Sequence, residues 1–113
     1  MLEIERIDMR RSALMRVSGR IDSSTASTFE EELMAAVDDK GNVVVNLAEV
    51  EFLSSAAIRA LIAALKETRE RTINRGDLVL TNVPTRLKEV FDLAAITSLF
   101  TFYEEEVYAV GAF

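Results

Sequence analysis

The sequence has no cysteine and no histidine. Without cysteine the chain has no disulfides, no thiolate metal ligands and no thiol nucleophile. Without histidine it has no Ser-His-Asp triad and no imidazole metal ligands. The four glycines lie far apart and form no glycine-rich phosphate loop, and no acidic run has the spacing of a calcium loop. These absences predict a protein that is not an enzyme and that holds neither a metal nor a cofactor.

The sequence also lacks a long hydrophobic run. No apolar stretch approaches the roughly 20 residues that span a membrane as a helix. The opening segment, MLEIERIDMRR, is strand-like and has no apolar middle of the kind found in signal peptides. We therefore expect a cytoplasmic protein without membrane insertion.

The composition that remains is typical of one folded domain. The chain has 113 residues, of which 50% are hydrophobic and 28% are charged, which suits a single domain over residues 1–113. The net charge of −6 argues against nucleic acid as a partner. Acidic residues gather at 30–39 and 104–106, and basic residues prevail at 59–75. Such runs are typical of solvated helix faces, and they also serve to steer protein partners.

Hydrophobic periodicity and turn signals predict nine elements. In chain order they are strands at 2–9 and 13–19, a helix within 20–42, a strand at 42–53, a helix at 56–72, a strand at 77–83, a helix at 84–96, a strand at 98–103 and a helix within 104–113.

Individual residues set the expected ends of these elements. Gly19 marks a bulge or bend in the second strand. Asp22, Ser23 and Ser24 are candidate N-caps of the first helix, and Gly41 is its expected end. The segment 74–76 is expected to end the second helix. The run Val43 to Val45 is apolar on both faces of its strand, which indicates a central strand.

The element order predicts an α/β fold. Alternating strands and helices require right-handed crossovers between parallel strands, and the opening hairpin adds an antiparallel pair. We expect a mixed, mostly parallel sheet of four or five strands with about four helices. Binding sites in such sheets lie in loops that follow the carboxyl ends of strands. The segment FLSSAA, residues 52–57, is such a loop and leads directly into a helix.

Two adjacent serines, Ser54 and Ser55, occupy this strand-to-helix junction. The start of a helix favours an anion because backbone N–H groups and the helix dipole point there. A serine is also a good N-cap, and Ser54 fits that role well. A catalytic nucleophile is excluded, because no base lies nearby in the sequence. The residues themselves leave two roles open, a helix cap and an acceptor of a phosphate.

The whole chain resembles the STAS domains of the bacterial anti-sigma factor antagonist family. The resemblance lies in three segments, VSGRIDSSTA at 17–26, VVVNLAEVEFLSSAAIRALIAAL at 43–65 and GDLVLTNVPTRLKEVFDLAAITSLF at 76–100. They occur in the family's order and at its spacing. The family loop commonly reads Asp-Ser-Ser/Thr-Gly-Leu, or Ser-Ser-Ala-Gly-Leu, after an aromatic and an aliphatic residue. Here Phe52 and Leu53 take those two places.

The resemblance implies a STAS fold with a phosphorylated serine. The family's acceptor matches Ser55, and Ser54 takes the place of the preceding Asp and is the less favoured acceptor. Asp22 matches the acid of the family's Gly-x-Leu-Asp signature near the same site, and its alternative role is to cap the first helix. The partner-binding residues expected from the resemblance are Asp22, Ser23, Ser24, Phe52, Leu53, Ser54, Ser55, Ala56, Ala57 and Arg59.

The implied mechanism is a partner switch that regulates transcription. The unphosphorylated chain binds an anti-sigma factor that is also a serine kinase, and this binding releases a sigma factor. The kinase then phosphorylates Ser55 with its own ATP, and the phosphate breaks the interface. A metal-dependent serine phosphatase resets the switch. All catalysis then belongs to the partners, in agreement with the missing histidine and cysteine.

Two family glycines are alanines in this chain. Ala57 replaces the loop glycine, and Ala95 replaces a glycine before the last strand. If position 57 needs a positive φ, alanine is penalised there; if it belongs to the first helical turn, alanine is favoured. We expect the Ala57 methyl group to stand where a kinase must reach Ser55.

Three other functions compete with the switch. A STAS scaffold or accessory subunit, in a stressosome-like or lipid-transport ABC complex, would use the same surface with a silent or slowly modified serine. Ala57 favours this alternative. A sensor would hold a nucleotide or lipid at the sheet edge, but no cavity-forming insertion is present. A weak phosphatase or NTPase is disfavoured by the composition.

Overall fold

The protein, in a computed structural model that describes residues 1–73 and 75–113, is built around one sheet of five strands. The strands are β1 (Leu2–Asp8), β2 (Ala13–Ile21), β3 (Val43–Leu53), β4 (Leu78–Thr81) and β5 (Thr101–Tyr103). The helices are α1 (Ala26–Lys40), α2 (Ser55–Glu70), α3 (Thr85–Leu93), the 3₁₀ turn η1 (Thr97–Leu99) and α4 (Glu106–Gly111). The strand order is β1-β2-β3-β4-β5; β1 runs antiparallel to β2 and the other pairs are parallel. The predicted mixed, mostly parallel α/β fold is confirmed.

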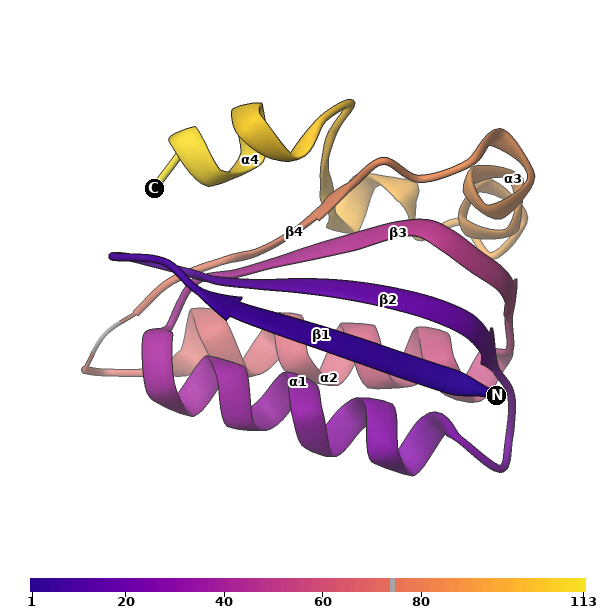
Figure 1. Ribbon diagram of the computed structural model, residues 1–113, viewed down its shortest axis with the longest axis horizontal. Coiled ribbons are helices and arrows are strands. Elements are labelled where there is room, and N and C mark those ends of the chain that lie inside the picture. Colours follow the sequence, from indigo (N-terminus) through magenta and orange to yellow (C-terminus); the bar gives the residue numbers. More distant parts are fainter. Residues whose placement is uncertain (74) are drawn as a thin grey trace.

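Helices cover the two faces of the sheet unequally. The long helices α1 and α2 lie side by side on one face, and the short α4 lies on the other (Figure 1). The larger core lies under α1 and α2 and includes Phe29, Leu33 and Leu61. A smaller cluster beneath α4 contains Val44 and Ala109. Val43 to Val45 are fully buried because β3 is covered on both faces, as the sequence predicted.

Several observed element ends differ from the predicted ones, among them the start of α1, the end of α2 and the start of β5. α1 begins at Ala26, so the expectation that Asp22, Ser23 or Ser24 caps it was wrong. α2 ends at Glu70, before the segment 74–76 that was expected to end it, of which Asn74 lies outside the described residues. The strand expected at 98–103 is a 3₁₀ turn in its first part, and the strand β5 begins only at Thr101.

Two predicted glycine positions are confirmed. Gly19 has a φ of 95°, and the pairing of β2 with β3 shifts register there. Gly41 follows the last residue of α1 with a φ of 78°, and its N–H donates to the carbonyl of Val37 at 2.8 Å. Both backbone conformations are open to glycine at little steric cost.

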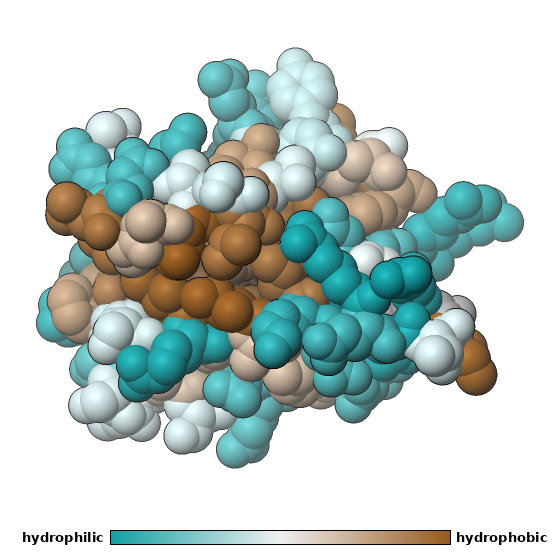
Figure 2. All heavy atoms as spheres, turned by 180° about the vertical axis from the view of Figure 1, so that it is seen from behind, coloured by the Kyte–Doolittle hydropathy of each residue, from teal (hydrophilic) through white to brown (hydrophobic). Residues whose placement is uncertain are grey.

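One side of the molecule has an exposed hydrophobic patch. The side opposite to the view of Figure 1 carries a patch of hydrophobic residues bordered by hydrophilic ones (Figure 2). Exposed apolar patches are typical of surfaces that contact other proteins. Among the described residues, no helix combines the length and the apolar character that a membrane crossing requires.

Candidate functional site: the loops after β2 and β3

The sheet brings two of the predicted segments together. β2 and β3 run parallel, and their last residues, Ile21 and Leu53, are register partners. The loop after β2 (residues 22–25) therefore starts beside the junction between β3 and α2. The N–H of Ser54 donates to the carbonyl of Ile21 at 2.9 Å and ties the two chain segments together. Asp22 and the serine pair, 32 residues apart in sequence, thus lie at one edge of the sheet.

Ser54 caps α2. Its backbone is extended, and its Oγ accepts a hydrogen bond from the N–H of Ala57 at 3.1 Å. Its carbonyl accepts the first helical bond, from the N–H of Ile58 at 3.0 Å. This geometry satisfies one of the N–H groups that a helix start leaves without a partner. The cap role predicted for Ser54 is confirmed.

Ser55 is the first residue of α2 and is exposed. The side-chain hydrogen bonds found among residues 1–73 and 75–113 do not include its hydroxyl. The cap requirement is met by its neighbour, so the Ser55 hydroxyl carries no structural task in this turn. Of the two serines, Ser55 is the one whose oxygen is accessible to a modifying group.

Asp22 organises the loop 22–25. Its carboxylate accepts hydrogen bonds from the Ser24 hydroxyl at 2.6 Å and from the Ser24 N–H at 2.9 Å. These bonds, and weaker ones from Thr25, lower the pKa of Asp22 below its ordinary value. The carboxylate therefore stays ionised at neutral pH. It holds the loop rather than a helix end, since α1 begins after Thr25 and has no side-chain cap.

Two arginines that the sequence analysis did not single out also shape this region. The guanidinium of Arg20 lies over the ring of Phe52, 4.5 Å from its centroid. Arg86 on α3 donates to the carbonyls of Val50 at 2.8 Å and Glu51 at 2.7 Å, which fixes the end of β3. The pairing of Arg20 with Phe52 follows from the strand register, whereas the reach of Arg86 depends on the tertiary fold.

Two of the expected partner-binding residues lie beneath the surface. Leu53 is 4% exposed and Ala57 is fully buried, whereas the other eight are at least partly exposed. Ala57 belongs to the first turn of α2, and the non-glycine residues with positive φ among those described are Asn82 and Ala95. The Ala57 methyl group packs into the core, so the expectation that it stands in front of Ser55 was wrong.

The backbone of Ala95 explains why the family commonly has glycine at this position. Its φ is 59°, in the left-handed region. Its N–H donates to the carbonyl of Asp92 at 3.0 Å, and the N–H of Ile96 donates to that of Phe91 at 3.1 Å. This pair of bonds is the Schellman arrangement that ends many helices, and its left-handed residue is usually glycine.

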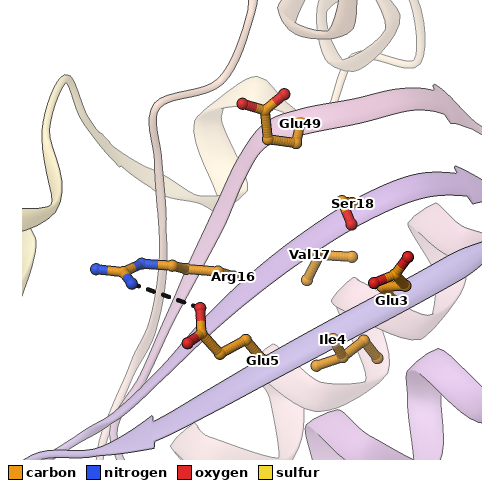
Figure 3. Close-up of a pocket in the computed structure, with 7 residues that line it drawn as sticks. All are labelled: Glu3, Ile4, Glu5, Arg16, Val17, Ser18 and Glu49. Atoms are coloured by element: carbon orange, nitrogen blue, oxygen red, sulfur yellow. Dashed lines mark hydrogen bonds and ion pairs between the residues drawn. The ribbon is translucent and has the colours of Figure 1, made fainter.

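The exposed face of the sheet has a separate hollow of about 440 Å³, lined by Glu3, Ile4, Glu5, Arg16, Val17, Ser18 and Glu49. Within it Arg16 faces Glu5 across the two strands, at 3.5 Å (Figure 3). None of the predicted site residues lines this hollow. Among the residues that the structure describes, no group of three acidic side chains is placed to hold a metal ion.

Comparison with known proteins places the chain in a family. The sequence model of the STAS domain matches residues 2–109. A protein of Bordetella bronchiseptica named "Putative anti-sigma factor antagonist BtrV" is 32% identical over 114 residues, which cover 99% of this chain and 93% of BtrV. The chain therefore belongs to the STAS domain family.

Solved structures have the same fold. The crystal structure of an anti-sigma factor antagonist from Mycobacterium paratuberculosis is similar with a TM-score of 0.84 at 24% identity, over 99% of this chain and 93% of that one. The Bacillus cell fate determinant SpoIIAA, in its phosphorylated form, is similar with a TM-score of 0.71 at 14% identity over the full length of both chains. Both likenesses confirm the predicted STAS fold.

Proposed function

We propose that this chain is an anti-sigma factor antagonist controlled by phosphorylation of Ser55. The observation that carries the proposal is the division between the two serines: Ser54 caps α2, and Ser55 presents an unused hydroxyl on the surface. The proposal is supported by the relative named "Putative anti-sigma factor antagonist BtrV" and by SpoIIAA, whose structure is known in a phosphorylated form.

In this mechanism the unphosphorylated chain binds an anti-sigma factor that is a serine kinase, and a sigma factor is released. The binding surface comprises the exposed residues of the loop 22–25, Phe52, the start of α2 and Arg59. The kinase moves the γ-phosphoryl group of its ATP onto the Ser55 oxygen, takes up the hydroxyl proton, and is left with ADP. A metal-dependent serine phosphatase hydrolyses the phosphoserine to serine and inorganic phosphate.

Charge accounts for the release. A phosphate adds nearly two negative charges at pH 7. It does so beside the loop that already holds the ionised Asp22, whose pKa is lowered. A partner surface that fits the neutral hydroxyl then faces an anion that must lose its hydration to remain in the interface. The chain itself supplies no catalytic group to either reaction.

The alternative of a STAS scaffold or transport subunit loses the observation that favoured it. That alternative depended on Ala57 as an obstacle to phosphorylation. The Ala57 side chain is fully buried, and Ser55 is exposed. The substitution of the family glycine thus leaves the approach to the Ser55 hydroxyl open.

Affinity capture from the host's lysate tests the proposal. The baits are the wild type, Ser55→Ala, Ser55→Asp, and Ser98→Asp as a control that adds the same charge to another exposed serine. We expect the wild type, Ser55→Ala and Ser98→Asp to retain one ATPase of the histidine-kinase-like class, and Ser55→Asp to lose it. Equal retention by Ser55→Asp, or no ATPase with any bait, would refute the switch.

A further inference from the structure

Arg59 lies one helical turn after Ser55. The two residues are four positions apart on α2, so they share a face of the helix, and their Cβ atoms are about 6 Å apart. Both residues are exposed. An anion on the Ser55 oxygen and the Arg59 guanidinium are therefore within reach of each other without any change in the backbone.

Arg59 has no carboxylate neighbour on its own helix. The positions three and four residues away on either side hold Ser55, Ala56, Ile62 and Ala63. Four arginines, Arg6, Arg16, Arg69 and Arg71, are each in a salt bridge, whereas the salt bridges among the described residues do not include Arg59. Of these four neighbours of Arg59, Ser55 has the polar side chain, and its hydroxyl carries no charge until it is phosphorylated.

Two charged side chains at the same edge of the sheet as Ser55, those of Asp22 and Arg20, have partners of their own. On the loop 22–25, Asp22 accepts hydrogen bonds from Ser24 and would repel a phosphate. On β2, Arg20 is stacked on the ring of Phe52. Glu67 and Glu70 share a groove between α1 and α2 with Arg59, but they lie eight and eleven residues further along α2. Arg59 is the cation on the same helix face that is one turn away.

We propose that Arg59 is the phosphate-binding residue of this chain and pairs with phosphorylated Ser55 within α2. The inference rests on the proposed function, because Ser55 must be the acceptor. Phosphorylation then acts twice on the interface. It adds negative charge, and it also draws the Arg59 guanidinium away from any carboxylate of the partner that this side chain contacts in the unphosphorylated state.

Phosphoserine placed at position 55 during translation, followed by ³¹P NMR titration, tests the pairing. The forms compared are the wild type, Arg59→Gln and Arg59→Lys, with Lys66→Gln as the control for a lost charge about 16 Å further along the helix axis than Ser55. Circular dichroism checks that each form is folded. We expect the second phosphate pKa to rise by about 0.3 when Arg59 becomes Gln. The interaction free energy of an exposed i,i+4 ion pair corresponds to a pKa change of about that size. In Arg59→Lys the second phosphate pKa should stay close to that of the wild type, because the positive charge is kept. In Lys66→Gln it should equal that of the wild type.

Coincident titrations of the wild type and Arg59→Gln would overturn the inference. Arg20→Gln is titrated as a further form. If the second phosphate pKa rises in Arg20→Gln and not in Arg59→Gln, the inference is also overturned, and the phosphate is assigned to Arg20. Because the phosphoserine is made on the ribosome, these outcomes do not depend on a kinase. Failure of the affinity capture alone would remove the switch and leave the Arg59 pairing intact.

Discussion

At the scale of single residues, the two serines of the junction differ in what their removal costs. Ser54→Ala deletes the hydrogen bond to the N–H of Ala57, and we expect a loss of about 1 kcal/mol in the free energy of unfolding. Ser55→Ala deletes no such bond, and we expect a change within about 0.5 kcal/mol. Urea unfolding of both variants measures the difference. Equal losses would show that Ser55 also caps the helix.

The two alanines that replace family glycines have opposite expected effects. Ala57→Gly removes a buried methyl group from a helical turn, and we expect a loss of about 1–2 kcal/mol. Ala95→Gly relieves a left-handed backbone, and we expect a gain of about 0.5–1 kcal/mol after the cost in unfolded-chain entropy. Thermal unfolding of both variants measures the sign. A stabilising Ala57→Gly or a destabilising Ala95→Gly would contradict the backbone assignment.

Residue chemistry in the sequence was sufficient to single out the candidate site but not to predict which of its residues are buried. Ser54 as a cap could be predicted because a helix start needs an acceptor. The burial of Ala57 could not, because an alanine carries little hydrophobic signal. The same is true of Leu53, which ends a strand whose inner face only the tertiary packing defines.

At the scale of elements, α4 is held on the sheet by polar contacts as well as by the smaller core. Glu106 accepts hydrogen bonds from Arg16 at 2.8 and 2.9 Å and from the side chain of Asn46. The two bonds from Arg16, more than the one from Asn46, lower the pKa of Glu106 below its ordinary 4.5, against the opposing effect of burial. Arg16 remains half-exposed, so water screens the pair and limits its strength.

This pKa predicts an acid sensitivity of α4. Because the folded pKa of Glu106 is lower than its unfolded value, the stabilisation is complete above pH 4.5 and is lost as the pH falls through the folded pKa. We expect the amide NMR signals of residues 106–111 to move in that range. Glu106→Gln should displace them already at pH 7, whereas Glu105→Gln, at the exposed neighbour, should not. Unchanged α4 signals in Glu106→Gln would refute the role of the ion pair.

Element order was predictable, and element ends were less so. The opening hairpin, the central strand and the alternation with helices all follow from hydrophobic period. The start of α1 was misplaced because three good capping residues, Asp22 to Ser24, precede it, and they form a turn of their own through the Asp22 carboxylate. Local hydrogen bonds of this kind compete with helix capping.

At the scale of the whole molecule, the parallel pairing of β2 with β3 assembles the candidate site. It sets the loop 22–25 beside Ser54 although the sequence separates them. The general rule that sites lie at the carboxyl ends of parallel strands singled out residues 52–57, whereas the place of Asp22 near them was implied only by the family resemblance. The contribution of Arg86, which reaches from α3 to the end of β3, could not be predicted because it requires the packing of α3.

The most direct test of the central claim is phosphoryl transfer within the captured complex. The purified chain, bound to the ATPase that it retains, is incubated with MgATP, and the modified residue is located by mass spectrometry while size-exclusion chromatography follows dissociation. The account predicts one phosphate on Ser55, release of the phosphorylated chain, and an intact, unphosphorylated complex with Ser55→Ala. A phosphate on Ser54, or equal dissociation with Ser55→Ala, would contradict it.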